Sequence, residues 1–94
     1  MIESYRDRKT RAFAEGGAVR EFSGFAGQAA RRLSILNAAT SLHDLRAMRS
    51  NRLVALSGDR KGQYSIRINQ QWRICFEWPV GTSGPRNVEI VDYH

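Results

Sequence analysis

The last three residues of the sequence, Asp92, Tyr93 and His94, have side chains that can transfer protons or bind a nucleotide. Asp and His act as general acid or base near neutral pH, and a Tyr ring can stack on a nucleobase. Beside arginines, such a set has what metal-free RNA cleavage needs. One group deprotonates the ribose 2′-hydroxyl, another protonates the departing 5′-oxygen, and cations stabilise the charge on phosphorus. On its own an Asp-Tyr-His ending is a weak signal, because chain ends usually fray.

Two strands joined by a short loop are predicted for the stretch that would hold arginines beside this tail. Apolar and polar residues alternate from Tyr64 to Ile68 and again from Trp72 to Trp78, with residues 69–71 between them. A loop of three residues pairs Ile66 with Ile74 and keeps one face of the hairpin apolar. A two-residue loop would set an apolar side chain against a charge, so we expect the longer one.

Arg67 and Arg73 lie opposite each other on the polar side of the hairpin in this register. Like charges directly opposite one another destabilise a strand pair. The pair therefore indicates an anion above that face, and guanidinium groups suit phosphate oxygens. The alternative is that both arginines extend to solvent and pair with Glu77, Asp59 or Asp92. The pattern alone supports these two interpretations equally.

Length and composition favour one small domain, spanning 1–94, with an acidic partner. Of the 94 residues, 41% are hydrophobic and 26% charged, as in ordinary globular proteins. The net charge is +6 and Arg supplies 13 of the 15 basic residues, which indicates nucleic acid or an acidic protein as partner. Met1–Lys9 is polar and charged, no apolar run reaches membrane length, and Cys75 is the single cysteine. We therefore expect a cytoplasmic protein with no disulfide and no membrane partner.

Neither a metal site nor a cofactor site is predicted. The histidines, His43 and His94, and the single cysteine make no cluster with metal-ligand spacing. The sequence also has no phosphate-binding glycine loop and no serine or cysteine triad. His43 lies in a short predicted helix beside Asp44, where a surface histidine is the commoner role.

Helices come first in the chain and the main strands follow. Apolar spacing and cap residues predict three helices, at 7–13, 25–39 and 42–48. Residues 18–24 have a poor pattern and are expected to form a loop. Met1–Tyr5 is predicted as an edge strand, and Asn87–Tyr93 as a last strand in a central position, because apolar residues lie on both of its sides. The layout is that of an α+β domain with helices packed on a small antiparallel sheet.

Two motifs in the second half of the sequence carry a family resemblance. They are GDRKGQYSIRINQQWRICFEW at 58–78 and NVEIVDYH at 87–94. MIESY at 1–5, LNAATSLHDLR at 36–46 and RLVALSGDR at 52–60 extend the match over nearly the whole chain. With these motifs the sequence resembles the HigB toxins, within the RelE superfamily of bacterial toxin–antitoxin systems. It is most similar to the GraT-like members, which share RLxALSG and NVEIVDYH.

The resemblance implies a compact RelE-like fold, with helices packed on a curved antiparallel sheet. It also implies an endoribonuclease that cuts messenger RNA in the ribosomal A site, in contact with 16S rRNA and without a metal. The products would be a 2′,3′-cyclic or 3′-phosphate and a 5′-hydroxyl. The implied protein partner is a HigA-type helix-turn-helix antitoxin that neutralises the toxin. Operator DNA would be reached only through that antitoxin.

The resemblance also assigns catalytic roles by position. Arg73 of the WRI motif would contact the scissile phosphate. Asp92, Tyr93 and His94 match the terminal Asp-Tyr-His of the family. Of these, His94 is expected to act as acid or base, and Tyr93 to position the nucleotide.

RNA-binding residues are expected in the segment before the hairpin and within it. Arg60 belongs to the matching GDR segment, whereas Lys61 and Arg67 are added from the sequence and the register. The chain departs from the HPLKGD pattern of other HigB toxins, because Val54 and Ser57 stand where those proteins carry His and Lys. That change removes one acid–base group and one positive charge.

Three functions are therefore open at the level of sequence. The first is a ribosome-dependent messenger RNA endonuclease. The second is a module that binds RNA or the ribosome and blocks translation without cutting, which the missing His and Lys favour. The third is a co-repressor whose basic surface serves operator DNA, for which the sequence offers no groove-reading helix.

Overall fold

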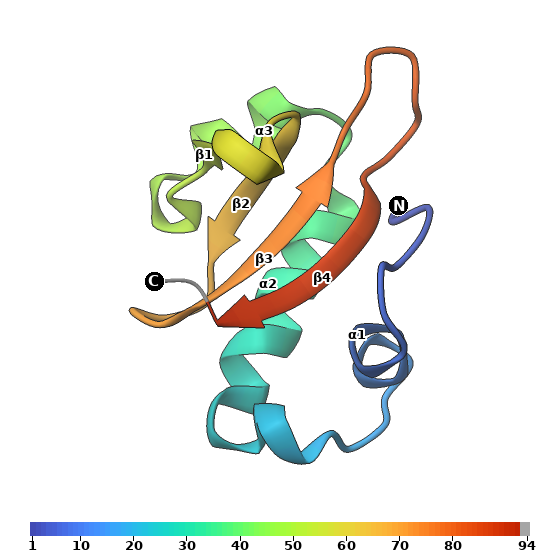
Figure 1. Ribbon diagram of the computed structural model, residues 1–94, viewed down its shortest axis with the longest axis vertical. Coiled ribbons are helices and arrows are strands. Elements are labelled where there is room, and N and C mark those ends of the chain that lie inside the picture. The colour runs from blue at the N-terminus through green and yellow to red at the C-terminus, as the bar shows by residue number, and fades with distance from the viewer. Residues whose placement is uncertain (93–94) are drawn as a thin grey trace.

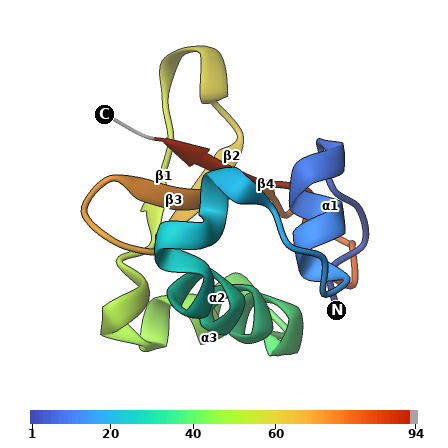
Figure 2. The ribbon, with the colours of Figure 1, turned by 90° about the horizontal axis from the view of Figure 1, so that it is seen from below.

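Within residues 1–92, which the computed structural model describes, the protein has two layers (Figures 1 and 2). One is a sheet of four strands, and the other consists of the helices within residues 26–47, which cover one of its faces. Tyr93 and His94, which the sequence predicts as site residues, lie outside the described residues. The helices are α1 (Arg8–Ala14), α2 (Ala26–Ala38) and α3 (Leu42–Ala47), and the strands are β1 (Val54–Ala55), β2 (Gln63–Arg67), β3 (Trp72–Glu77) and β4 (Arg86–Asp92). The predicted α+β class, with helices packed on an antiparallel sheet, is confirmed.

The three predicted helices are confirmed, with bounds that differ slightly. Asp7 caps α1, and its carboxylate accepts a hydrogen bond of 2.8 Å from the Thr10 N–H. Ser41 caps α3, and its hydroxyl accepts one of 3.2 Å from the Asp44 N–H. The Asp44 carboxylate in turn accepts bonds from the hydroxyl and the N–H of Thr40, which lower the pKa of Asp44.

The strands are antiparallel and follow the order β1-β2-β3-β4. In the β2–β3 pair, Ile66 lies opposite Ile74 and Arg67 opposite Arg73, so the predicted register is confirmed. The side chain of Asn69 fixes the turn, because its oxygen accepts two backbone hydrogen bonds of 2.8 Å from the residues that lead into β3. Alternation then gives the sheet one apolar face and one polar face.

The core lies between α2 and the apolar face of the sheet. Ala29 on α2 is fully buried, and its small side chain lets the helix lie close to the strands. The other main members of this core are Leu33 and Leu36 from α2 and Ile66, Ile74, Phe76 and Val88 from the sheet. This packing fixes the face of the sheet that points away from the helices.

The expected loop at 18–24 is wrong, since Arg20–Phe25 forms a 3₁₀-helix. Phe22 and Phe25 are buried in it, with ring centroids 5.9 Å and 4.8 Å from that of Trp72. Aromatic pairs at these distances attract each other beyond their burial. The pattern failed because the tertiary contacts of two aromatic rings, not an α-helical period, hold this segment.

The first residues do not form the predicted edge strand. Tyr5 makes a single parallel bridge to Val88, and the Arg6 N–H donates a 2.9 Å hydrogen bond to the Val88 carbonyl. The chain leaves the sheet immediately afterwards because Asp7 caps α1. Residues 1–6 therefore follow β4 without becoming a fifth strand of the described sheet.

The last strand is an edge strand, so its predicted central position is wrong. It is covered by other means, because α1 lies along its outer side (Figure 1) and the Thr10 hydroxyl accepts a 3.0 Å bond from the Ile90 N–H. Its polar side holds Glu89, which is only 9% exposed. Burial on both sides misled the prediction, because a helix and ion pairs replace the expected neighbouring strand.

Candidate active site

The candidate site is the face of the sheet that points away from α2, called the polar face below. Figure 2 shows α2 and α3 on one side of the sheet and the segment that leads from β1 to β2 on the other. The strand pairing places two rows of residues on the polar face. One row is Val54, Ser65, Cys75 and Glu89, and the other is Arg67, Arg73 and Val91.

Arg73 lies over the polar face and donates hydrogen bonds to two neutral oxygens. Its Nε donates a 2.7 Å hydrogen bond to the Ser65 hydroxyl, and an NH2 donates one of 2.6 Å to the Arg52 carbonyl. Ser65 is fully buried, and Arg52 has a left-handed backbone with φ 46° that turns the chain toward the sheet. The guanidinium is thus oriented before any ligand arrives, which favours transition-state stabilisation.

Arg67 lies opposite Arg73, as predicted. Its Nε donates a 3.1 Å hydrogen bond to the Asn69 carbonyl, which is also a neutral acceptor. Among residues 1–92 no carboxylate lies within 4.0 Å of the Arg67 guanidinium, and Glu77 instead lies 3.6 Å from Arg6. The suggested pairing of Arg67 with Glu77 is therefore wrong, and a second cation faces the solvent beside Arg73.

Arg60 takes part in a network that the sequence does not reveal. Its NH1 donates hydrogen bonds of 2.8 Å to Glu89 and 3.0 Å to Gln63. Arg6, from the start of the chain, lies 3.6 Å from the same Glu89 oxygen. The Glu89 side chain is only 11% exposed, so two arginines compensate a nearly buried carboxylate. The position of Arg6 had no signal in the sequence, because only the fold brings residue 6 beside β4.

Lys61 does not lie with Arg67 and Arg73. It precedes β2, whereas Arg67 ends that strand, and the four steps from Gln63 to Arg67 alone cover roughly 13 Å. Lys61 therefore belongs to the opposite end of the sheet from the arginine pair. The structure brings together Arg67 and Arg73, and it places Lys61 apart from them.

Asp92 ends β4 close to the arginine pair, but on the other face by register. It lies opposite Trp72, while its neighbour Val91 lies opposite Arg73. Asp92 is exposed, and its carboxylate accepts a 2.9 Å hydrogen bond from Gln71. Asp92 therefore lies at the same end of the sheet as Arg73.

Val54 lies on the polar face at the edge strand β1, at the position where other members of the resembled family carry a histidine. It belongs to β1, a two-residue strand that was not predicted, and it pairs with Ser65. Val54 is 45% exposed, which is unusual for a large apolar side chain that no helix covers. The residue that departs from the family pattern, Val54, therefore lies next to Ser65, which accepts the hydrogen bond from Arg73. Ser57 lies just before the 3₁₀ turn Gly58–Arg60.

The described part of the chain gives less support to a metal site or a reactive thiol. No group of three His, Cys, Asp or Glu side chains there is arranged to hold a metal ion. Cys75 is fully buried below the arginines, and burial raises the pKa of its thiol. None of the helices among residues 1–92 is long and apolar enough to cross a membrane.

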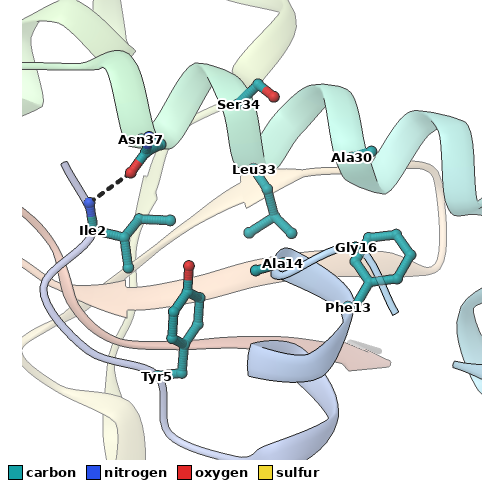
Figure 3. A pocket seen from close by; sticks show the side chains of 9 residues that line it. All are labelled: Ile2, Tyr5, Phe13, Ala14, Gly16, Ala30, Leu33, Ser34 and Asn37. Atoms are coloured by element: carbon teal, nitrogen blue, oxygen red, sulfur yellow. Dashed lines mark hydrogen bonds between the residues drawn. The ribbon is translucent and has the colours of Figure 1, made fainter. Parts of the chain in front are cut away.

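A hollow of about 320 Å³ lies on the other side of the protein, between residues 1–5, α1 and α2 (Figure 3). Its walls include Phe13, Leu33 and the Tyr5 ring, and Asn37 accepts a 2.9 Å hydrogen bond from the Ile2 N–H at one end. Burial raises the pKa of the Tyr5 hydroxyl. None of the predicted site residues within 1–92 lines this hollow, so the polar face remains the candidate site.

Comparisons with known proteins define the class. A family model described as the RelE-like toxin of the type II toxin–antitoxin system HigB matches residues 3–94. Toxin HigB-1 of Vibrio cholerae serotype O1 is 45% identical over 53 residues, which are 56% of each chain. Endoribonuclease HigB of Proteus vulgaris is 32% identical over the full length of both chains. A YoeB/ParE toxin from Agrobacterium tumefaciens has a TM-score of 0.42 and 19% identity, and the match covers 79% of this chain and 86% of that one.

The chain forms a helix-covered sheet with arginines on its open face. The family model matches residues 3–94, so the protein is a RelE-like toxin of a type II toxin–antitoxin system. This chain belongs to the HigB-like toxin family. The family implies an antitoxin as protein partner.

Proposed function

We propose that this toxin is an endoribonuclease that cuts messenger RNA in the ribosomal A site and so inhibits translation. The observation that carries the proposal is the oriented guanidinium of Arg73, with Arg67 beside it on an open face. The full-length similarity to a protein named Endoribonuclease HigB supports the same activity.

The proposed reaction is the attack of a ribose 2′-oxygen on the adjacent phosphorus. The P–O5′ bond breaks, and the products are a 2′,3′-cyclic phosphate and a 5′-hydroxyl. Arg73 and Arg67 would stabilise the extra negative charge on the phosphoryl oxygens. Within this proposal, Asp92 and His94 accept the 2′-proton and donate one to the 5′-oxygen, and Tyr93 positions the nucleotide. We propose that no metal takes part, so cleavage should continue in excess chelator.

The proposed partners follow from the same assignment. They are messenger RNA and 16S rRNA in the ribosome, and an antitoxin of the HigA type with a helix-turn-helix. Operator DNA would be bound only through that antitoxin, and the toxin would act in the cytoplasm. Support comes from the net charge of +6 and from the family, in which toxins of type II systems have a protein antitoxin.

Primer extension on messenger RNA in a reconstituted translation reaction tests the proposal. The wild type should give ribosome-dependent cuts, and Arg73→Ala should lose them. Arg31→Ala is the matched control, because Arg31 is an exposed arginine of α2 on the other side of the protein. Loss of cleavage in both variants alike, or in neither, would contradict the placement of the site.

A second candidate function is inhibition of translation by occupancy, without cutting. It is favoured by Val54, an exposed apolar residue beside Ser65 where an acid–base histidine would stand. Translation arrest by the wild type with intact messenger RNA would support this function and refute the nuclease.

A further inference from the structure

A separate hollow lies at the end of the sheet where β2 begins and β3 ends. Its volume is about 380 Å³, within the range of small-ligand sites. Tyr64 and Trp78 form aromatic walls, Lys61 supplies a cation, and Glu77 borders the hollow from the polar face. The exposed side chain of Val80 extends the apolar wall on the β3–β4 connection.

The side chains of this hollow have binding capacity that the described residues do not use. Among residues 1–92, the Tyr64 hydroxyl, the Trp78 indole N–H and the Lys61 ammonium make no hydrogen bond or salt bridge. The Tyr64 ring is fixed by stacking on Phe76, with centroids 6.1 Å apart. In the same part of the chain, the Trp78 ring packs against no other aromatic ring. An indole with an available face and donor is well suited to stack on a planar ligand.

The charges around the hollow favour an anionic ligand. Among residues 1–92, Glu77 is the only carboxylate that lines it, and this group is compensated within the fold. Arg6 lies 3.6 Å from one Glu77 oxygen, and the Asn87 side chain donates a 3.1 Å hydrogen bond to the other. Lys61 makes no such pair within the described residues, and it directly follows Arg60. A phosphate next to an aromatic base satisfies both the cation and the rings.

We propose that this hollow binds one unstacked base of single-stranded RNA, with the base against Trp78 and Tyr64 and its phosphate on Lys61. The inference rests on the proposed function, because it needs an RNA strand that leaves the polar face around the end of the sheet where β2 begins. Tyr64 lies opposite the buried Phe76, and Trp78 also packs against the core, so both rings lie toward the helices. From Ser65, which holds Arg73, to Gln63 is roughly 7 Å along β2, and Lys61 lies two residues further on. A few nucleotides therefore connect the scissile phosphate with the hollow. The hollow would thus be a subsite for the base of a nucleotide near the scissile phosphate.

Tryptophan fluorescence tests the stacking directly. Trp72→Phe leaves Trp78 as the only tryptophan of the chain, and Trp78→Phe leaves Trp72 as the matched reporter within the aromatic cluster. The probe is 2′-O-methyl hexaadenylate, which has no 2′-hydroxyl to attack its backbone. A hexamer with the same backbone and no bases serves as control. We expect saturable quenching of Trp78 by the hexaadenylate, weak quenching by the abasic hexamer and little change at Trp72.

The affinity for RNA is a second measurement, and it does not depend on single-tryptophan variants. Fluorescence anisotropy of a labelled hexaadenylate should show about tenfold weaker binding for Trp78→Leu, the usual effect of losing one base stack. Thermal melting checks that each variant is folded, and Lys61→Gln provides an independent variant at the rim, expected to weaken binding and its salt dependence.

The failing outcomes are distinct. Bound RNA without quenching at Trp78, equal quenching by the abasic hexamer, or no RNA binding by the wild type would each overturn the inference. Quenching by the purified antitoxin but not by RNA would also overturn it and assign the hollow to the protein partner. Messenger cleavage that stays intact in Trp78→Leu, with no quenching, would refute this subsite and leave the proposed function standing. Quenching without any messenger cleavage would support the subsite and refute the nuclease.

Discussion

Ser65→Ala should slow RNA cleavage without touching any RNA, because Ser65 acts through Arg73. The hydroxyl is fully buried and accepts a 2.7 Å hydrogen bond from the Arg73 Nε. Alanine removes this acceptor and changes little else in the strand. The guanidinium would keep its 2.6 Å bond to the Arg52 carbonyl, but it would lose one of the contacts that fix its direction.

The expected magnitude follows from the strength of that bond. A hydrogen bond to a charged group contributes roughly 1.5–3 kcal/mol, and about 1.4 kcal/mol of transition-state stabilisation corresponds to a factor of ten in rate. Because the Arg52 contact remains, we expect the lower end, about ten- to thirtyfold slower cleavage. KM should change little, since the substrate still meets the same charges. The free energy of unfolding should fall by about 1 kcal/mol.

The assay combines cleavage rates on programmed ribosomes with urea unfolding of the same preparations. Ser23→Ala is the control, because the Ser23 hydroxyl is exposed and donates only a local 2.8 Å hydrogen bond to the Arg20 carbonyl. In an Arg73→Ala background, Ser65→Ala should have no further effect on cleavage, as expected when one residue acts through the other. Equal rates for Ser65→Ala and the wild type, or full additivity in the double variant, would refute the reasoning.

The other predictions concern charge, pH, the chain end and the polar face. Glu89→Gln should destabilise the fold by about 1–3 kcal/mol in urea unfolding, because Arg60 would lose the carboxylate that compensates it; an unchanged midpoint would contradict this. The hydrogen bond from Arg86 is the main cause that lowers the pKa of Glu3 to about 2 from 4.5. The contribution of Glu3 to stability is therefore present above pH 4.5 and lost as the pH falls toward 2, and Glu3→Gln should flatten the urea midpoint over that window. Deleting residues 93–94 should abolish growth inhibition with an unchanged melting temperature, whereas a fully toxic truncation would remove the tail from catalysis. Val54→His should speed messenger cleavage, since the new side chain would enter the polar face beside Ser65; a slower or equal rate would exclude an acid–base role there.

Local patterning was enough to predict the hairpin and its two arginines. Period-two alternation and the length of the loop allow only one register with an apolar face, and that register sets Arg67 against Arg73. Local signals also predicted the helices, because α2 carries the apolar spacing of a helix and α1 and α3 begin at capping residues. These features depend on residues that are close in the sequence.

The partners of those arginines could not be predicted in the same way. Arg73 is oriented by a backbone carbonyl 21 residues away, and a carbonyl has no residue type to recognise. In the sequence, Glu89 is an ordinary polar position of a strand, because Arg6 and Arg60 lie close to it only in the folded protein. The edge position of β4 could not be predicted for a related reason. The burial of β4 comes from α1 and ion pairs and not from a further strand. Long-range contacts of single residues leave no period in a sequence.

The distribution of acceptors divides the polar face into two halves with different tasks. Toward the start of β2, the carboxylates Glu77 and Glu89 lie within 3.6 Å of Arg6, and Glu89 also accepts from Arg60 at 2.8 Å. Charges matched in this way stabilise the fold and change little when RNA arrives. Toward the end of β2, Arg67 donates to the Asn69 carbonyl and has no carboxylate within 4.0 Å among residues 1–92.

A neutral acceptor fixes the direction of a guanidinium and leaves its full charge in place. An arginine held by a carboxylate would exchange one anion for another when phosphate binds, and would gain little. An arginine held by a carbonyl, as Arg67 is, gains the whole interaction with the charge that develops on phosphorus. The end of the face that holds Arg67 is therefore where we expect the scissile phosphate to bind. At the matched end, the pair with Glu89 holds the 3₁₀ turn Gly58–Arg60 against the sheet.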